Sequence, residues 1–375
     1  MPNMYTLVAP CFFGTEHTLS FEVKRLGAQN VKVTDGRVAF EGDAAMIAAA
    51  NLNLRTAERV LLLLKIFPAA TFDELFDGVY SIPWEELIPV GAQFPVKGSS
   101  LSSQLSSVPA CQSIVKKAIV KRLQYGHKTT TLPETGALYK IRFALRKNVV
   151  EVMLDTSGDG LHKRGYRKNA TLAPIKETLA AGIIDLARIR ENDTVCDPFC
   201  GSGTLLIEAG LKALNIAPGL NRSFAAERLG FVSDKAWRAA RSEAADAIKR
   251  DAKFRAFGYD IDGECISLTL SNAKKAAPQL NITAERRDIR DYVPTADELK
   301  IITNPPYGER LLERQEAEEL YRMLGKVWKT LPEGWRTLVL SSHTEFERAF
   351  GRPADKRRKL YNGMIKCDVF FYGNV

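Results

Sequence analysis

The chain has 375 residues, of which 45% are hydrophobic and 26% are charged, and its net charge is +9. This is the composition of a globular protein with two or three cores, and the excess of positive charge favours a polyanionic partner. No apolar run approaches the roughly 20 residues of a membrane helix, and the amino terminus lacks a signal-peptide pattern, so we expect a cytoplasmic protein that does not cross a membrane.

Residues 4–67 alternate strand-like and helix-like patterns in the order βαββαβ, which predicts a ferredoxin-like unit over residues 1–68. A second unit follows over residues 69–160. It contains the serine-rich "KGSSLSSQLSS", a basic helix from about Ala110 to Tyr125, and two strands joined around Lys147 and Asn148.

After Gly160 the pattern changes to a long alternation of helices and apolar strands, which is typical of parallel βαβ units. We expect strands at 193–198, 255–260, 282–287, 299–304 and 335–341, helices at 174–189, 203–215, 262–276 and 314–331, and a closing hairpin. Residues 161–375 are therefore predicted to form a Rossmann-like α/β domain, interrupted by an insertion at about 216–250.

The cysteines and histidines do not predict a metal site. Six cysteines are scattered without a CxxC pair, and only four histidines occur. Cys196 and Cys200 stand four residues apart but have no second ligand pair near them. We expect neither a disulfide framework nor a bound metal.

The segment "DTVCDPFCGSGTLLIEAG" predicts a ligand-binding loop. It places Asp197 at a strand end and Gly201 and Gly203 before a helix, so that a ligand can approach the backbone and the helix amino end. A phosphate loop would need a lysine after the last glycine, and a dinucleotide fingerprint would need a small residue where Leu206 stands. Both alternatives fit poorly.

Two later strand ends carry further acidic residues. "GYDID" places Asp260 where open α/β sheets bind ribose hydroxyls, and "RRDIRD" places Asp288 beside Ile289, a pair suited to an adenine amine and ring face. Three carboxylates at successive strand ends favour a nucleoside ligand. A fourth strand ends in Asn304-Pro305-Pro306-Tyr307, where the prolines stop the strand and stiffen the loop.

In this order and spacing, "DPFCGSGT", "GYDID", "RRDIRD" and "NPPYG" resemble the S-adenosylmethionine-dependent methyltransferases of exocyclic amino nitrogens. The upstream "DTSGDGLHKRGYRKNATLAPIKETLAAGII" resembles the junction of THUMP-domain RNA methyltransferases, and "IAPGLNRSF" resembles the insertion of the bacterial large-subunit rRNA guanine-N2 branch. The resemblance covers nearly the whole chain. It implies a class I methyltransferase domain with a mostly parallel seven-stranded sheet, preceded by a ferredoxin-like unit and a THUMP RNA-binding domain.

In such relatives the insertion continues with an aromatic residue beside a glutamate and a tryptophan shortly after. This chain departs from that pattern, with Ala226-Glu227-Arg228-Leu229 at the corresponding place, so the resemblance implies no base contact from these residues.

The resemblance also implies the site residues. S-adenosylmethionine is the expected donor, with contacts from Thr171, Pro174, Asp197, Pro198, Gly201, Gly203, Thr204, Asp260, Ile261, Asp288, Ile289 and Asn304. Catalytic roles are expected for Asn304, Pro305 and Tyr307. An attacking amine gains positive charge, so the Asn304 side-chain carbonyl and the Pro305 backbone carbonyl can accept its N–H groups. Tyr307 offers a ring on which the base can stack, a role that needs no hydroxyl.

Basic residues gather in three clusters, at 116–122, 162–168 and 355–359, which we expect to bracket one site. Phosphate contacts are expected from Lys116, Lys117, Lys121, Arg122, Lys163, Arg164, Arg167, Lys356, Arg357 and Arg358.

The leading hypothesis is methyl transfer to the N2 amine of a guanine in large-subunit (23S) rRNA or its assembly intermediate. Guanine in tRNA and the N6 amine of adenine are alternatives, because both present an exocyclic amine to the same acceptors. A protein glutamine or DNA adenine methyltransferase would share the Asn-Pro-Pro-Tyr chemistry but would leave residues 1–160 unexplained. An inert RNA-binding scaffold is disfavoured because the donor loop and the acceptor motif are both intact. The sequence does not indicate an oligomeric state.

Overall fold

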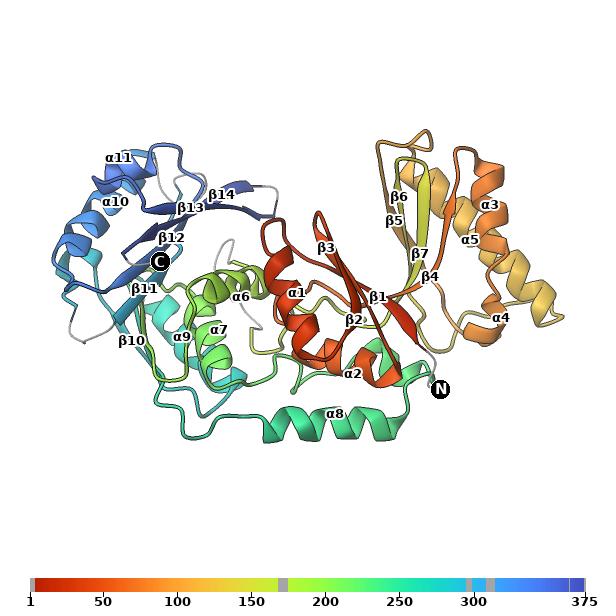
Figure 1. The fold of residues 1–375 in the computed structure, drawn as a ribbon, viewed down its shortest axis with the longest axis horizontal. Helices are drawn as coiled ribbons and strands as arrows, with labels where there is room; N and C mark the ends of the chain where they lie inside the picture. The colour runs from red at the N-terminus through yellow and green to blue at the C-terminus, as the bar shows by residue number, and fades with distance from the viewer. Residues whose placement is uncertain (1–3, 168–174, 295–298, 308–313, 364, 374–375) are drawn as a thin grey trace.

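The protein is described by a computed structural model that covers residues 4–167, 175–294, 299–307, 314–363 and 365–373. Two seven-stranded sheets organise an elongated molecule. In Figure 1 a carboxy-terminal α/β domain lies at one end, a second unit with its own helical layer lies at the other, and the amino-terminal unit lies between them.

The amino-terminal unit has the predicted βαββαβ order. Its elements are β1 (Tyr5–Pro10), α1 (Glu16–Arg25), β2 (Gln29–Thr34), β3 (Arg37–Gly42), α2 (Ala44–Asn53) and β4 (Leu61–Pro68). Asp43 caps α2 by accepting a hydrogen bond from the Met46 backbone N–H over 2.9 Å. The predicted ferredoxin-like arrangement is confirmed.

The second unit contains α3 (Phe72–Tyr80), α4 (Trp84–Leu87), β5 (Val96–Leu101), α5 (Val108–Gly126), β6 (Ile141–Arg146) and β7 (Val149–Asp155). The predicted basic helix and the predicted hairpin are both present. Lys147 and Asn148 make the hairpin turn with positive φ angles. The start of the serine-rich segment forms the edge strand β5, whose glycine and serines gave no strand signal.

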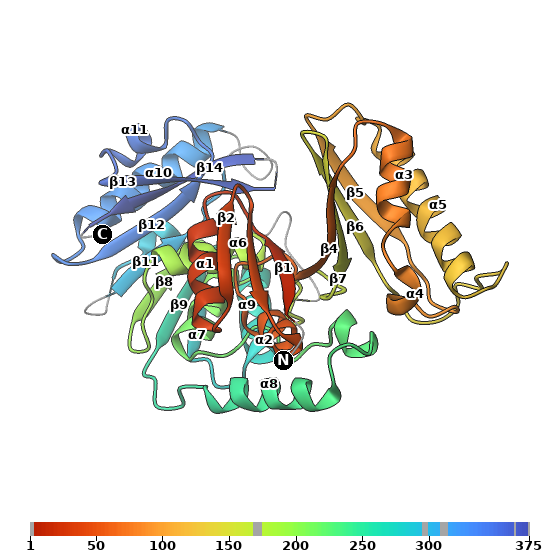
Figure 2. The same ribbon diagram turned by 45° about the vertical axis from the view of Figure 1, so that its right-hand side comes forward.

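Strand β4 joins these two units into one sheet. Its first residues pair with β1, and its whole length pairs with β7, with an irregular register between Leu63 and Lys65. The resulting order is β2-β3-β1-β4-β7-β6-β5, and the two units meet at a bend visible in Figure 2. The two units therefore share one continuous sheet.

The carboxy-terminal domain has the expected mostly parallel sheet. Its helices are α6 (Glu177–Leu186), α7 (Thr204–Ala213), α8 (Asp234–Asp246), α9 (Gly263–Ala276), α10 (Arg314–Lys329) and α11 (Phe346–Phe350), with short 3-10 turns η1 (Ala225–Arg228) and η2 (Ile289–Asp291). Its strands are β8 (Thr194–Asp197), β9 (Arg255–Asp260), β10 (Ile282–Arg286), β11 (Leu299–Thr303), β12 (Arg336–Ser341), β13 (Lys356–Asn362) and β14 (Ile365–Tyr372).

The strand order of this sheet is β10-β9-β8-β11-β12-β14-β13, and β14 alone among these seven strands runs against the others, pairing antiparallel with β12 and with β13. Strands β8, β9 and β10 lie side by side in chain order, and the chain then crosses back so that β11 pairs with the other side of β8. Open α/β sheets bind ligands at such a switch point, beyond the carboxyl ends of the strands.

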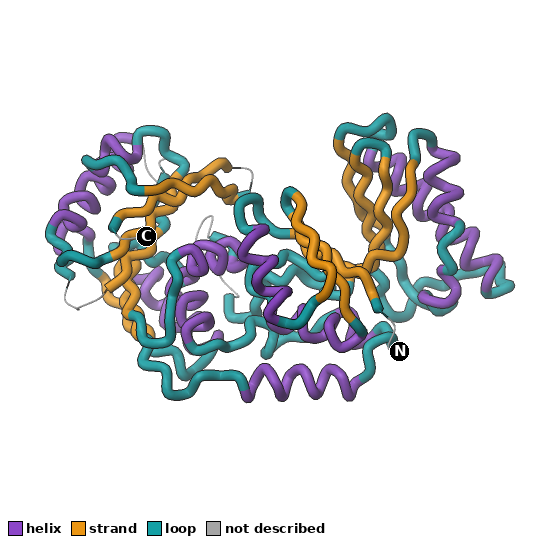
Figure 3. The backbone as a smooth tube through the Cα atoms, in the orientation of Figure 1, coloured by secondary structure: helices purple, strands orange, loops and turns teal. Residues whose placement is uncertain are grey.

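The insertion connects the carboxy-terminal domain to the amino-terminal unit. Its helix α8 packs along α2, and the Gly219 N–H donates to the Leu52 carbonyl over 2.9 Å. Trp237 is 4% exposed and stacks on Phe224 with ring centroids 5.5 Å apart, inside the amino-terminal core. Figure 3 shows α8 as a long helix at the margin of the molecule. Trp237 is therefore a packing residue that ties α8 to the amino-terminal unit.

Across the described ranges, no helix combines the length and the apolar character needed to cross a bilayer.

Candidate active site

The glycine loop after β8 forms one wall of a cavity of about 830 Å³, within the range of small-molecule sites. Gly201 and Gly203 both have positive φ, +53° and +78°. A Cβ atom at Gly201 would meet no atom within 4 Å, whereas one at Gly203 would lie 2.8 Å from the Thr269 methyl group. The first glycine therefore keeps the backbone open to a ligand, and the second permits close packing of α7 on α9.

Asp260 holds this loop from the next strand. Its carboxylate accepts hydrogen bonds from the backbone N–H groups of Gly201 and Asp262, each over 3.0 Å. Burial raises the pKa of Asp260, and these two hydrogen bonds oppose the shift. Beside it, the Ile261 side chain is 62% exposed on the cavity wall.

Asp197, at the end of β8, is almost fully buried. Its Oδ1 atom accepts hydrogen bonds from the Thr303 hydroxyl over 2.6 Å and from the Phe199 N–H over 3.1 Å. Burial raises the pKa of Asp197 to about 7, and the nearby charge of Asp260 acts in the same direction. A cationic ligand group beside Asp197 would favour its ionised form.

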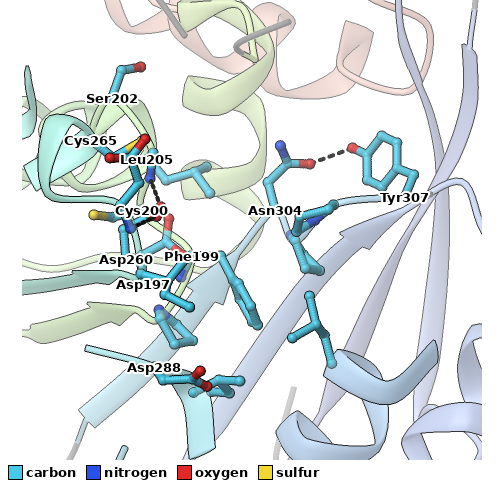
Figure 4. Close-up of a pocket in the computed structure, with 18 of the residues that line it drawn as sticks. Asp197, Phe199, Cys200, Ser202, Leu205, Asp260, Cys265, Asp288, Asn304 and Tyr307 are labelled. Carbon is cyan, nitrogen blue, oxygen red and sulfur yellow. Dashed lines mark hydrogen bonds between the residues drawn. The ribbon is translucent and has the colours of Figure 1, made fainter. Parts of the chain in front are cut away.

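Asp288 and Ile289 line the cavity beyond β10, at its far end from Tyr307 (Figure 4). Asp288 caps η2 by accepting a hydrogen bond from the Arg290 N–H over 2.9 Å. Three of the four strand ends predicted from the sequence thus line one cavity.

The fourth strand end faces the same cavity from β11. The Tyr307 hydroxyl donates a hydrogen bond to the Asn304 Oδ1 atom, as Figure 4 shows. The Tyr321 hydroxyl of α10 holds the loop by donating to the Pro306 carbonyl over 2.7 Å. The interpretation of Tyr307 as a ring alone is therefore incomplete, because its hydroxyl contacts the amide oxygen assigned to catalysis.

The wall of the cavity around Asn304 and Tyr307 also includes residues that the sequence motifs did not indicate. Asn362 and Ile365, which flank the tip of the β13–β14 hairpin, line the cavity, and Asn362 interacts with the Tyr307 side chain. They lie far from the recognised motifs in sequence, so no local pattern could have identified them.

The predicted donor and catalytic residues otherwise converge as expected. The cavity lining includes Asp197, Pro198, Gly201, Thr204, Asp260, Ile261, Asp288, Ile289, Asn304, Pro305 and Tyr307. Gly203 lies behind this surface, and Thr171 and Pro174 lie outside the described residues. Within the described parts of the chain, no group of three or more histidine, cysteine or acidic side chains could hold a metal ion.

Two of the predicted phosphate contacts are wrong because their guanidinium groups are internal. The Arg164 side chain is 2% exposed, lies 3.4 Å from Glu208, and donates to the Arg55 carbonyl over 2.5 Å. Arg167 pairs with Glu177 over 2.9 Å and also donates to the Ile175 carbonyl. Arg164 thus joins the amino-terminal unit to the carboxy-terminal domain.

Other members of the basic clusters are engaged nearer the surface. Lys116 pairs with Glu134 over 2.7 Å, and Arg122 donates to Glu85 over 2.8 Å. Arg357 donates to Glu347 over 2.8 Å.

Lys117, Lys121 and Lys356 are exposed, Arg358 is half-buried, and Lys163 is exposed with Asp159 3.5 Å away. The cluster at 116–122 lies on α5 at the opposite end of the molecule from β13, so the three clusters do not bracket one site (Figure 1).

Family models match three successive parts of the chain. They are an RlmL ferredoxin-like domain over residues 6–61, a THUMP domain over residues 69–155, and an RMKL-like methyltransferase domain over residues 164–370.

Among curated proteins, the chain is 43% identical over 370 residues to "Putative RNA methyltransferase YpsC" of Bacillus subtilis (strain 168), covering 98% of this chain and 96% of that protein. It is 34% identical to "Ribosomal RNA large subunit methyltransferase K/L" of Shewanella sp. (strain MR-4), covering 96% of this chain and 51% of that longer protein. The solved structure of SMU.472, "a putative methyltransferase complexed with SAH", superposes with a TM-score of 0.92 at 40% identity and full coverage of both chains.

Proposed function

Because this chain belongs to the THUMP-containing, RMKL-like family of S-adenosylmethionine-dependent RNA methyltransferases, we propose that its target is the N2 amine of a guanine in large-subunit rRNA. One observation carries the choice of an exocyclic amine. The Asn304 amide oxygen and the Pro305 carbonyl belong to one stiffened loop, which lines the same cavity as the donor loop. The large-subunit rRNA assignment is supported by the name of the Shewanella relative.

The donor side fits S-adenosylmethionine, which supplies an electrophilic methyl group when bound. We assign Asp197 to the ammonium of its methionine part, Asp260 to its ribose hydroxyls, and Asp288 with Ile289 to its adenine. The open backbone at Gly201 and the exposed apolar face of Ile261 match a ligand with polar and flat aromatic parts. Thr171 and Pro174 are predicted to complete the methionine end.

The acceptor side would position the target amine in line with the donor methyl group. The amine lone pair attacks, the new N–CH3 bond forms as the S–CH3 bond breaks, and a proton then leaves the nitrogen for solvent. Asn304 Oδ1 and the Pro305 carbonyl accept the N–H groups as positive charge develops. The hydrogen bond from the Tyr307 hydroxyl orients the Asn304 amide toward the target amine. It occupies one lone pair of Asn304 Oδ1 and leaves the second lone pair of that atom for the amine. The rate enhancement comes from alignment of the reacting nitrogen, methyl and sulfur atoms and from hydrogen bonds to these acceptors, and it needs no strong base.

The target base must leave a helical stack to enter the cavity, at a cost of a few kcal/mol. After the internal arginines are excluded, we assign phosphate contacts to the surface members of the clusters: Lys117, Lys121, Lys163, Lys356 and Arg358.

The test is methyl transfer from labelled donor to large-subunit rRNA, small-subunit rRNA, tRNA, duplex DNA and a peptide release factor in parallel. We expect label in large-subunit rRNA, and nucleoside mass spectrometry is expected to identify N2-methylguanosine. Label recovered as N6-methyladenosine or in tRNA would replace the base or the RNA in the proposal. Label in DNA or protein alone would overturn the RNA assignment.

A further inference from the structure

A second cleft, of about 540 Å³, lies where the amino-terminal unit meets the carboxy-terminal domain. Three separate parts of the chain form it: α1, the region around the ends of α6 and α7, and the strands β13 and β14. Its lining includes an exposed ring and five cations, which together we call the basic cleft: Phe21, Arg188, Arg190, Lys212, Lys356 and Arg358.

The basic cleft holds more positive charge than its own carboxylates neutralise. Asp185, on its wall, pairs with Lys212 over 2.5 Å. Within the described part of the chain, the other four cations, Arg188, Arg190, Lys356 and Arg358, have no acidic partner within ion-pair distance, and Arg358 Nε is buried without a hydrogen bond. Four like charges gathered in one concave surface repel one another and are stabilised by a polyanion.

An aromatic ring stands among these charges. Phe21 is 50% exposed, and the His17 ring packs against it in a T-shaped arrangement with ring centroids 4.6 Å apart. An exposed ring beside unpaired cations is the combination with which proteins hold single-stranded nucleic acid, because bases stack on the ring while cations contact phosphates.

The basic cleft is not the methylation site. Arg188 and Arg190 precede β8, whereas Asp197 ends that strand. The basic cleft therefore lies at the amino-terminal ends of the parallel strands, and the donor cavity lies at their carboxyl ends. An RNA segment bound there must be distant from the nucleotide that reacts.

We propose that the basic cleft binds a flanking single-stranded segment of the substrate RNA, with one base stacked on Phe21 and successive phosphates on Arg188, Arg190, Lys356 and Arg358. This rests on the proposed function in taking RNA as the substrate. Because α1 and β13 come from different parts of the chain, the bound segment contacts both the amino-terminal unit and the carboxy-terminal domain. The cleft contributes to RNA affinity and leaves the chemical step unchanged.

The experiment compares full-length variants for large-subunit rRNA affinity over a range of salt concentrations. Arg188→Gln with Arg190→Gln should weaken binding about tenfold and lower the slope of log affinity against log salt by about 1 to 2, because two phosphate contacts are lost. Phe21→Ala should weaken binding by about tenfold with an unchanged slope, because stacking releases no counterions. Lys235→Gln with Arg238→Gln, on the exposed face of α8, is the matched control and should bind like the wild type.

Affinity for S-adenosylhomocysteine, thermal stability and turnover at saturating RNA should match the wild type in every variant. An unchanged salt slope and affinity in the double variant, or no RNA affinity in the wild type, would overturn the cleft assignment. Wild-type RNA binding without methyl transfer to any RNA would instead overturn the proposed function, while the variant comparison would still decide the role of the cleft.

Discussion

The cavity walls that we assign to the donor and to the acceptor, the donor side and the acceptor side, are built differently. Asp197, Gly201 and Asp260 belong to two adjacent parallel strands and their following loop, and a backbone hydrogen bond joins the loop to the second strand. The acceptor side combines the Asn304 to Tyr307 loop with Asn362 and Ile365 from a distant hairpin, through side-chain contacts. The donor side is thus a property of one βαβ arrangement, while the acceptor side depends on how separate elements meet.

This difference predicts that changes on the acceptor side reduce turnover, whereas changes on the donor side reduce donor affinity. Asn304→Ala removes one acceptor from the developing positive charge and should lower turnover by about a hundredfold or more, with little change in donor or RNA affinity. Single-turnover kinetics and calorimetry on one preparation measure both quantities. If Asn304 only stabilises the turn, the variant will melt earlier and turn over normally.

On the donor side, Asp260→Ala removes the carboxylate assigned to the ribose and also the acceptor for the Gly201 N–H. We expect donor affinity to fall by about ten- to a hundredfold, the range for losing a hydrogen bond to a charged group. Asp260→Asn keeps the shape and one acceptor and should lose less. Unchanged S-adenosylhomocysteine affinity in Asp260→Ala, measured by calorimetry, would remove Asp260 from the ribose role.

Tyr307→Phe tests the contact that the ring-only interpretation omitted. Loss of the hydroxyl frees the Asn304 amide to rotate, so turnover should fall by roughly five- to tenfold while RNA affinity is retained. Tyr307→Ala should lower both turnover and apparent RNA affinity, because the stacking ring is also lost. Wild-type turnover in Tyr307→Phe would show that packing alone orients Asn304.

The smallest predicted effect is the pH dependence of donor binding. The Asp197 pKa of about 7 lies above its unfolded value, so the free protein loses stability as pH rises through the window from about 4 to 7. The assigned contact with the donor ammonium needs the ionised carboxylate. Donor affinity should therefore rise about fivefold from pH 6 to pH 7, with proton release on binding.

Asp197→Asn is expected to bind the donor weakly, with a nearly flat profile over this interval. Calorimetry in buffers of different ionisation enthalpy measures the released proton. A wild-type profile that is already flat would contradict the assignment of Asp197 to the ammonium.

The amino-acid sequence by itself determined the order of the elements and the convergence of three acidic strand ends on one cavity. Apolar periodicity identified the parallel βαβ domain, and the motifs after β8, β9 and β10 placed Asp197, Asp260 and Asp288 at strand ends. Parallel strands bring their carboxyl ends to one edge, so local patterns were sufficient for this prediction.

Only the tertiary structure decided which basic side chains are available to a ligand and which strand belongs to two units at once. Arg164 and Lys356 carry the same charge in similar basic clusters, yet one is buried against Glu208 and the other lies in the basic cleft. In the same way, β4 reads as one strand of the amino-terminal unit, but its pairing with β7 joins two units into one sheet. Burial and pairing depend on residues distant in sequence, so no local pattern encodes them.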